Sequence, residues 1–242
     1  MIKRLAYTLA VLLGIALVPR PAFPHPSVDE QIAGLTARIE RQPSDPSLYL
    51  KRGDQHRYRG NWSDSLADYR RARRIDPALE VVDLRLGALF LDLDQPRRAK
   101  NALDVYLARR PRDRFGLRLR SRAFRLLGMP LAAAEDLRRV IDACPPPHRP
   151  EPDDYLERAR AFEAAGGDHL GEAILALDEG MAALGPIVSL QIPAIELDVR
   201  VGRFEDALRR VDVLERGSER RDVWLFKRAE ILERAGPPQP DR

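Results

Sequence analysis

The sequence predicts an all-α fold, a right-handed solenoid of about five helix pairs with a lone helix at each end. The first reason is a recurrence. Three helical patterns end in a proline, at Pro77, Pro111 and Pro145, and both steps are 34 residues (111 − 77 and 145 − 111). The second reason is that 34 residues is the period of a helix–turn–helix unit. A helix pair leaves one apolar face open and only a neighbouring pair covers it, so a fixed period predicts a stack.

Residue size recurs within each unit when the terminal proline is numbered position 32. Positions 8 and 20 are small, which lets two helices approach, and positions 11 and 24 are large and fill the space between them. Position 8 reads Gly53, Gly87 and Ser121, position 20 reads Ser65, Ala99 and Ala133, position 11 reads His56, Phe90 and Phe124, and position 24 reads Tyr69, Leu103 and Leu137. We expect these positions to form the contact between the two helices of a unit.

The turn inside each unit has a fixed place as well. Position 15 reads Gly60, Asp94 and Gly128, residue types that accept a positive φ more readily than others. Pro96 and Pro130 follow two residues later. Proline is favoured in the first turn of a helix, because the N–H that it lacks has no intrahelical partner there. The second helix of these units is therefore predicted to begin at the proline.

The pattern extends in both directions, and a proline-rich insertion at 144–154 separates the third unit from the fourth. The expected helices number twelve, with a disordered tail at 237–242. The units are expected at about 46–79, 80–113, 114–147, 152–187 and 188–221, and the flanking helices at 28–42 and 222–235.

Between residues 28 and 236 the chain resembles the tetratricopeptide-repeat (TPR) family. The Leu-Gly step of LRLGALF, the position-20 alanines and the position-32 prolines fall where that repeat has them. The chain departs from it at position 4, which is aromatic in Tyr49 and Tyr155 but reads Asp83 and Gln191 in two other units. The resemblance implies a protein-binding function, with a concave wall lined by positions 2, 5, 9, 12 and 13 of each first helix.

Residues 1–22 are predicted to be a signal peptide or an uncleaved N-terminal anchor, followed by a proline-rich linker at 23–27. The charged start MIKR precedes an apolar run at 5–18, which is shorter than the roughly 20 residues of a membrane span. Ala22 is a candidate cleavage residue, but Arg20 departs from the small-x-small pattern, so both alternatives stay open. We expect an exported protein, periplasmic or secreted, or one held at the inner membrane by residues 5–18.

The chain is mildly basic, with a formal charge of +4, and nearly all its cations are arginine. Residues 97–125 hold eleven Lys and Arg against two Asp, a local balance of +9 (11 − 2). Such a segment attracts phosphate groups, so anionic lipid and nucleic acid are alternative partners. The export signal and the lack of interleaved aromatic residues for base stacking argue against nucleic acid. Both rank below a protein or peptide partner.

The sequence contains no constellation typical of catalysis. Its four histidines, at positions 25, 56, 148 and 169, form no HExxH motif and no i, i+4 ligand pair. The single cysteine, Cys144, has no assigned base and cannot form an intramolecular disulfide. No GxSxG motif and no phosphate-binding glycine loop occurs. We expect no enzyme activity, no cofactor, no metal and no small-molecule substrate.

Positions 7 and 23 vary together, which predicts ion pairs inside two units. Position 7 reads Arg52, Leu86, Arg120 and Arg158, and position 23 reads Asp68, Ala102, Asp136 and Ala176. Arginine faces aspartate in the first and third units, and leucine faces alanine in the second. We predict the ion pairs Arg52–Asp68 and Arg120–Asp136, the alternative being that the arginines extend into solvent.

The concave positions give the predicted partner-binding site. Arg118, Arg122 and Arg125 are four and three residues apart and share one helical face. A cationic wall and an apolar floor suit an extended segment with acidic residues or a free C-terminal carboxylate, the alternative being that the arginines are only solvated. The expected contact residues are Arg57, Tyr58, Leu84, Ala88, Leu91, Phe115, Arg118, Arg122, Arg125 and Arg160.

Overall fold

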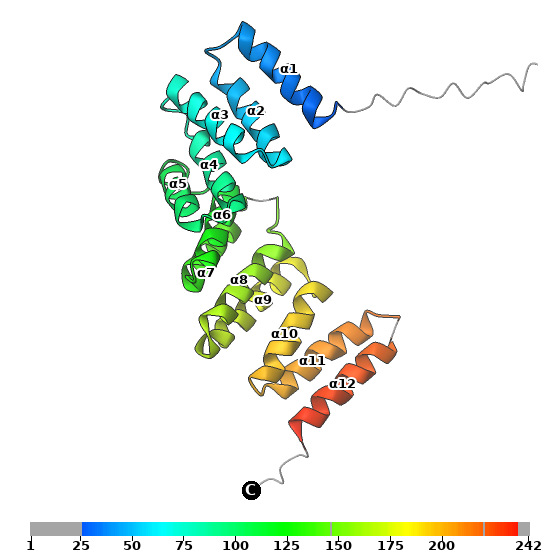
Figure 1. Ribbon diagram of the computed structural model, residues 1–242. Coiled ribbons are helices and arrows are strands. Elements are labelled where there is room, and N and C mark those ends of the chain that lie inside the picture. Colours follow the sequence, from blue (N-terminus) through cyan, green and yellow to red (C-terminus); the bar gives the residue numbers. More distant parts are fainter. Residues whose placement is uncertain (1–25, 146, 220, 237–242) are drawn as a thin grey trace, which may run out of the picture.

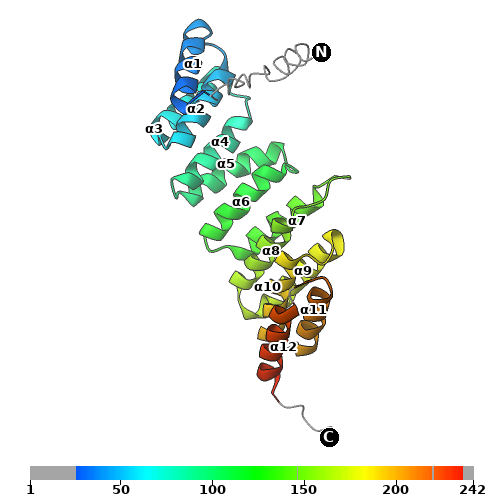
Figure 2. The ribbon, with the colours of Figure 1, turned by 90° about the vertical axis from the view of Figure 1, so that its right-hand side faces the viewer.

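The computed structural model describes residues 26–145, 147–219 and 221–236, and over these ranges it has twelve α-helices, one short 3₁₀-helix and no strand. The helices follow one another in chain order along an elongated stack (Figures 1 and 2). The predicted all-α solenoid is confirmed. The predicted signal peptide or anchor, residues 23–25 of the linker and the predicted tail lie outside the described residues.

Five antiparallel helix pairs stand between two single helices. The single helices are α1 (Val28–Arg41) and α12 (Arg221–Ala235), and a 3₁₀-turn, η1 (Gly167–His169), precedes α9. The pairs are α2 (Pro46–Arg59) with α3 (Trp62–Ile75), α4 (Val81–Asp92) with α5 (Pro96–Arg109), α6 (Arg114–Leu126) with α7 (Pro130–Asp142), α8 (Pro152–Ala165) with α9 (Leu170–Leu184), and α10 (Val188–Arg200) with α11 (Phe204–Arg216).

The turn residues adopt the backbone that the repeat demands. Gly60, Asp94 and Gly128 have φ values of 84°, 51° and 68°, so all three position-15 residues are left-handed. Pro96 and Pro130 occupy the first turn of α5 and α7, as predicted. A left-handed residue followed by a helix start reverses the chain within a few residues, so the two helices of a unit lie side by side.

Close helix approach explains the small residues at position 8. A Cβ added to Gly53 would lie 2.6 Å from Tyr69 Cε1 of α3, and one added to Gly87 would lie 2.5 Å from Leu103 Cγ of α5. The large position-24 residue of the paired helix therefore fills the space that a side chain at position 8 would occupy. This contact sets the interhelical distance within a unit.

The core runs along the stack as a series of apolar clusters. One cluster joins α1 to α6 and includes the fully buried Leu48, Tyr69 and Leu89. A second joins α7 to α10 around Leu177 and Leu190. In α4, nine of the twelve residues are buried, because the helix is covered by α3, α5 and α6.

The insertion between the third and fourth units changes the spacing of the first helices. Nine residues (143–151) connect α7 to α8, whereas five (76–80) connect α3 to α4 and four (110–113) connect α5 to α6. By Cα proximity, α6 contacts α8 less than it contacts α4. The wider step opens a hollow between α6 and α8.

None of the described helices has both the length and the apolar character that crossing a bilayer requires.

Candidate functional site

The larger hollow lies on the first helices near the N-terminal end of the stack, and we call it the N-terminal groove. It has a volume of about 640 Å³ and takes its residues from α1, α2, α4 and α6. Its lining is Val28, Gln31, Asp54, Gln55, Arg57, Tyr58, Leu84, Arg85, Ala88 and Phe115. Five of the residues predicted to bind a partner therefore meet in one place.

The N-terminal groove has an apolar floor between two aromatic rings. Leu84 and Ala88 form the floor and are only 6% and 4% exposed, because α4 is packed on both sides. Tyr58 and Phe115 are 81% and 52% exposed. Exposed rings beside an apolar floor are typical of surfaces that bind side chains of another protein.

The charges in the N-terminal groove are matched to each other. Asp54 accepts hydrogen bonds from the Tyr69 hydroxyl at 2.7 Å and from Arg85 Nε at 2.9 Å. Burial and the Asp54 hydrogen bond both raise the pKa of Tyr69, which stays protonated. Arg57 Nη1 lies 3.3 Å from Asp92 Oδ2. This groove therefore offers apolar and aromatic contacts more than free charge.

The second hollow lies between α6, α7 and α8, and we call it the α6–α8 cleft. Its volume is about 300 Å³. Its lining is Arg118, Ser121, Arg122, Arg125, Ala133, Leu137, Glu151, Asp153, Asp154, Glu157 and Ala161. The three arginines predicted to form a cationic wall share this cleft, which is separate from the N-terminal groove.

Arg118 is held in an ion pair, and its side chain is 32% exposed. Its Nε and Nη2 donate to Asp154 Oδ1 and Oδ2 at 2.7 and 2.8 Å, and its Nη2 lies 3.2 Å from Glu151 Oε2. The hydrogen bond to Asp154 raises the pKa of Arg118. Arg114 Nη2 also donates to Asp154, at 3.2 Å. These bonds tie α6 to α8 across the widened step.

Asp154 is the acceptor that sequence reasoning missed. An acidic residue in the first turn of a helix favours a capping role, and the Asp154 Oδ2 does accept the backbone N–H of Glu151 at 3.1 Å. Its side chain is also 3% exposed and accepts from two arginines of α6. The sequence gives one indication of this contact. Asp154 lies in the first turn of α8, about one unit after Arg114 and Arg118, and the repeat register predicts no partner for either arginine.

Arg122 and Arg125 are exposed on α6, and no ion pair or hydrogen bond of theirs occurs within the described part of the chain. The facing wall on α8 is acidic, with Glu151, Asp153 and Glu157. The cleft thus has one cationic and one anionic wall. Arg122 and Arg125 are the cations of the predicted site that remain free to bind a carboxylate.

Two other predicted contact residues lie outside both hollows. Leu91 is 3% exposed and packs in the core cluster of α1–α6. Arg160 is exposed on α8 and pairs with Glu157 at 2.6 Å, one turn away on the same helix.

The arginine-rich segment 97–125 is less cationic at its surface than its composition indicates. Acidic side chains from other parts of the chain neutralise several of its arginines. Arg110 pairs with Glu80, Arg114 and Arg118 with Asp154, and Arg120 with Asp104 and Asp136.

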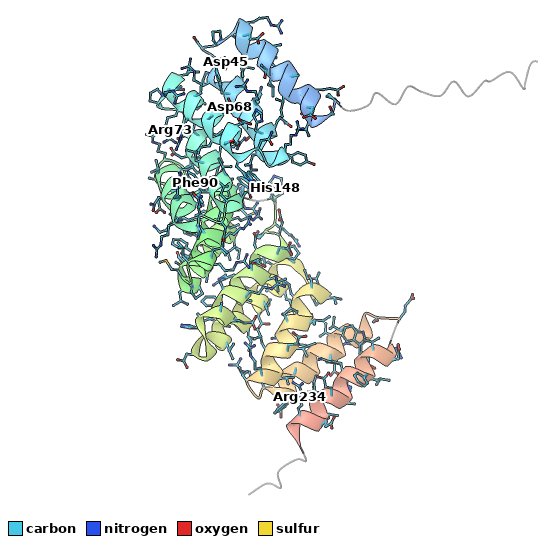
Figure 3. The ribbon with its side chains drawn as sticks, viewed as in Figure 1. Asp45, Asp68, Arg73, Phe90, His148 and Arg234 are labelled. Atoms are coloured by element: carbon cyan, nitrogen blue, oxygen red, sulfur yellow. The ribbon has the colours of Figure 1, made fainter. Side chains whose placement is uncertain are left out.

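Both predicted intra-unit ion pairs are in contact. Arg52 Nε and Nη2 donate to Asp68 at 2.9 and 2.7 Å, and Asp68 lies among the first three helices (Figure 3). Arg120 Nε and Nη2 donate to Asp136, both at 2.7 Å. Asp136 is 2% exposed, so this pair is almost fully shielded from water.

The candidates for catalysis stay apart. Within the described ranges, no group of three or more His, Cys, Asp or Glu is placed to hold a metal ion. His56 packs between helices, and Cys144 follows the end of α7 as a partly buried free thiol.

These features define a fold, a helix-pair solenoid like that of TPR proteins, with two hollows along its first helices. Comparisons with solved structures agree. YrrB, described as a TPR protein with an unusual peptide-binding site, has a TM-score of 0.61 at 15% identity, over 82% of this chain and 99% of YrrB. PilW, described as a type IV pilus biogenesis factor, has a TM-score of 0.59 at 18% identity, over 80% of this chain and 88% of PilW. MamA from Desulfovibrio magneticus RS-1 has a TM-score of 0.57 at 16% identity, over 74% of this chain and 92% of MamA. At these identities the likeness establishes the fold.

Sequence comparison adds one partial match. No family model matches the chain. The "Protein SGT1 homolog" of Oryza sativa subsp. japonica is 34% identical over 70 residues, which is 29% of this chain and 19% of the rice protein.

Proposed function

We propose that the protein is a non-catalytic scaffold that binds an extended segment of another protein along its first helices. The observation that carries this proposal is the N-terminal groove, whose apolar floor lies between two exposed aromatic rings. The fold supports it, since a helix-pair solenoid presents long surfaces and encloses no reaction chamber. The peptide-binding site ascribed to YrrB supports the same class of function.

The two hollows favour different parts of such a segment. Apolar side chains would pack on Leu84 and Ala88 beside the rings of Tyr58 and Phe115. An acidic side chain or a C-terminal carboxylate would bind Arg122 and Arg125 through charge-assisted hydrogen bonds. The acidic wall of α8 would repel a uniformly acidic segment, so we expect a segment with one or two carboxylates rather than a polyanion.

Peptide selection tests the proposal and does not require the natural partner to be identified first. A displayed library of random peptides with free C-termini is selected on the wild-type chain, and recovered peptides are synthesised as free acids and as amides. Affinities are then measured for Tyr58→Ala with Phe115→Ala, and for Arg122→Gln with Arg125→Gln. We expect each double variant to weaken binding by about 10-fold or more, as loss of aromatic or charged contacts does.

The matched control is Arg70→Gln with Arg112→Gln, two exposed arginines outside both hollows. Arg118 is left unchanged because it holds Asp154. Equal affinity of all three double variants for every recovered peptide would contradict the proposal.

We further propose that the protein is exported, from the charged start and the apolar run at residues 5–18. A membrane-attached accessory factor is the alternative, and it differs in whether residues 1–22 are removed. The mass of the protein recovered from cell envelopes distinguishes the two.

A further inference from the structure

The last helix, α12, has an apolar stripe that no described residue covers. Leu225 and Leu232 are 54% and 51% exposed, and Ala229 between them is also exposed. The three residues are four and three apart, so they share one face, which we call the α12 outer face. An adjacent face, with Trp224 and Ile231, packs against α10 and α11.

The repeat register shows that the α12 outer face corresponds to positions that are buried in the earlier first helices. Residue 222 lies 34 after Val188, the start of the fifth unit, so Leu225, Ala229 and Leu232 occupy positions 4, 8 and 11. Position 4 is buried in all five earlier first helices, at Tyr49, Asp83, Leu117, Tyr155 and Gln191. The small or branched residues at position 8 are buried as well. At position 8 the cover comes from the second helix of the same unit, as Tyr69 covers Gly53 and Leu103 covers Gly87.

The arginine at position 7 also indicates that α12 lacks the second helix of its pair. Arg120 bridges Asp104 of the preceding second helix at 2.8 Å and Asp136 of its own second helix at 2.7 Å. Arg228 of α12 pairs with Asp212, which stands in the register of Asp104 on the preceding second helix. No described helix supplies a counterpart of Asp136. α12 thus presents half of a helix-pair contact, including its arginine.

The other end of the stack is built differently. α1 stands in the register of a second helix, and its positions 20, 23 and 27 are Gln31, Gly34 and Arg38. Gly34 has open space beside it and Arg38 is exposed. Position 24 of α1 is the apolar Leu35, but positions 20, 23 and 27 do not match, so α1 of a second copy lacks the small residue, the acidic residue and the second apolar residue of the pattern.

We propose that the α12 outer face binds an amphipathic helix of a partner protein, which takes the place of the second helix of a sixth pair. Two of the chain's own second helices, α3 and α7, define its chemistry: a small residue, an acidic residue three positions later, a large apolar residue at four and an apolar residue at seven. α7 has this pattern in Ala133, Asp136, Leu137 and Val140. The proposal is independent of the groove, since α12 lines neither hollow.

The first test asks whether the face accepts such a helix. Residues 237–242 are replaced by the sequence of residues 129–142, so that it follows Gly236 as it follows Gly128, both position-15 glycines with positive φ (73° and 68°). We expect Tm to rise by several degrees, because a helix pair buries the two leucines. The rise should disappear with Leu225→Ser and Leu232→Ser. An unchanged Tm in the extended chain would overturn the proposal.

The second test adds the helix in trans. A labelled peptide of residues 129–142, stapled on its solvent face because short helices are marginal in water, is titrated into the full chain. We expect saturable binding that is lost with Leu225→Ser and Leu232→Ser and kept with the control Val105→Ser and Leu175→Ser, whose side chains are 49% and 60% exposed on other helices. An Asp136→Ala peptide should bind about 3- to 10-fold more weakly, since Arg228 then loses the carboxylate that the peptide adds to its bonds with Asp212 and Glu215.

Two outcomes of the second test would overturn the proposal. One is equal affinity for the α12 variant and the control. The other is concentration-dependent self-association of the wild-type chain that the α12 substitutions abolish, which would make a second copy the occupant of the face.

Discussion

At the scale of the residue, the buried aspartates depend on arginines that also serve a neighbouring helix. Asp136 is 2% exposed and accepts two hydrogen bonds from Arg120, with Arg139 at 3.2 Å as its other partner. In the second unit the same contact is apolar, with Leu86 at position 7 and Ala102 at position 23. The chain therefore accepts this contact both with the ion pair and without it.

We expect Asp136→Ala to lower the free energy of unfolding by about 2–4 kcal/mol, because it strands a half-buried guanidinium. The double variant Arg120→Leu with Asp136→Ala copies the second unit and should lose less than Asp136→Ala alone. Urea unfolding of both single variants and the double variant measures the coupling. Removal of the exposed cation Arg138, whose partners are also exposed, should cost at most about 0.5 kcal/mol. Additive losses in the double variant would rule out the pairing as a stability element.

Asp198 gives a second residue-scale prediction, concerning pH. It is fully buried, with Arg210 Nε 2.7 Å from its Oδ2, and its Oδ1 has no hydrogen-bond partner within the described residues. Burial raises the pKa of Asp198 above 3.8 more than Arg210 lowers it, and Asp206 and Asp178 add to the rise. The folded state therefore binds this proton more tightly than the unfolded state does.

The stability that Asp198 contributes is present below its unfolded pKa and is lost as pH rises through the raised folded value. Asp198→Asn does not ionise, so it should gain stability relative to wild type as pH rises from about 3 to 7. Urea unfolding across this range measures the difference. A wild type that instead gains on the variant would mean that Arg210 lowers the pKa below its ordinary value.

At the scale of the element, the glycines of the helices divide into two kinds. A Cβ on Gly87 would lie 2.5 Å from Leu103, whereas one on Gly34 of α1 would meet nothing within 4 Å. Helix propensity favours alanine at both sites by about 1 kcal/mol. Only at Gly87 does the paired helix oppose the change.

We expect Gly34→Ala to stabilise the protein by about 0.5–1 kcal/mol and Gly87→Ala to destabilise it by about 1–3 kcal/mol through overpacking. Thermal melts of the two variants make the comparison within one protein. A gain at Gly87 equal to that at Gly34 would show that α4 and α5 move apart at no cost.

The elements were predictable where the signal is local. Pro96 and Pro130 begin their helices, and Gly60 and Gly128 turn the chain, because each of these residues restricts or frees its own backbone. The ion pairs were predictable because positions 7 and 23 change together.

The site was less predictable, because it depends on spacing between units. Arg118 and Asp154 meet across the insertion, where the 34-residue register no longer holds. Sequence reasoning found the local bond of Asp154 to its own helix and not the two arginines that reach it from α6. It also placed Leu91 in the groove, although this residue is buried in the core cluster of α1–α6.

At the scale of the molecule, contacts join helices that are near neighbours along the chain. The stability of such a stack is approximately a sum over units and the interfaces between them, so its ends open before its middle. The helices at the ends also have the fewest buried residues. α12 has one buried residue, Ile231, whereas α4 has nine.

Amide hydrogen exchange should therefore be fastest in α1 and α12 and slowest in α4. Ile231→Ala removes the one buried anchor of α12, at a local cost of about 2–5 kcal/mol, and should speed exchange in α11 and α12 while α2 to α5 keep their wild-type rates. Leu103→Ala, with a fully buried side chain in the middle of the stack, should instead speed exchange in α4 to α7. Mass spectrometry of peptides from each helix separates these patterns. If Ile231→Ala accelerated amide exchange equally in all helices, the chain would unfold as one cooperative unit. The interfaces between units would then have to couple α12 to the N-terminal pairs with an energy larger than that of a single buried side chain.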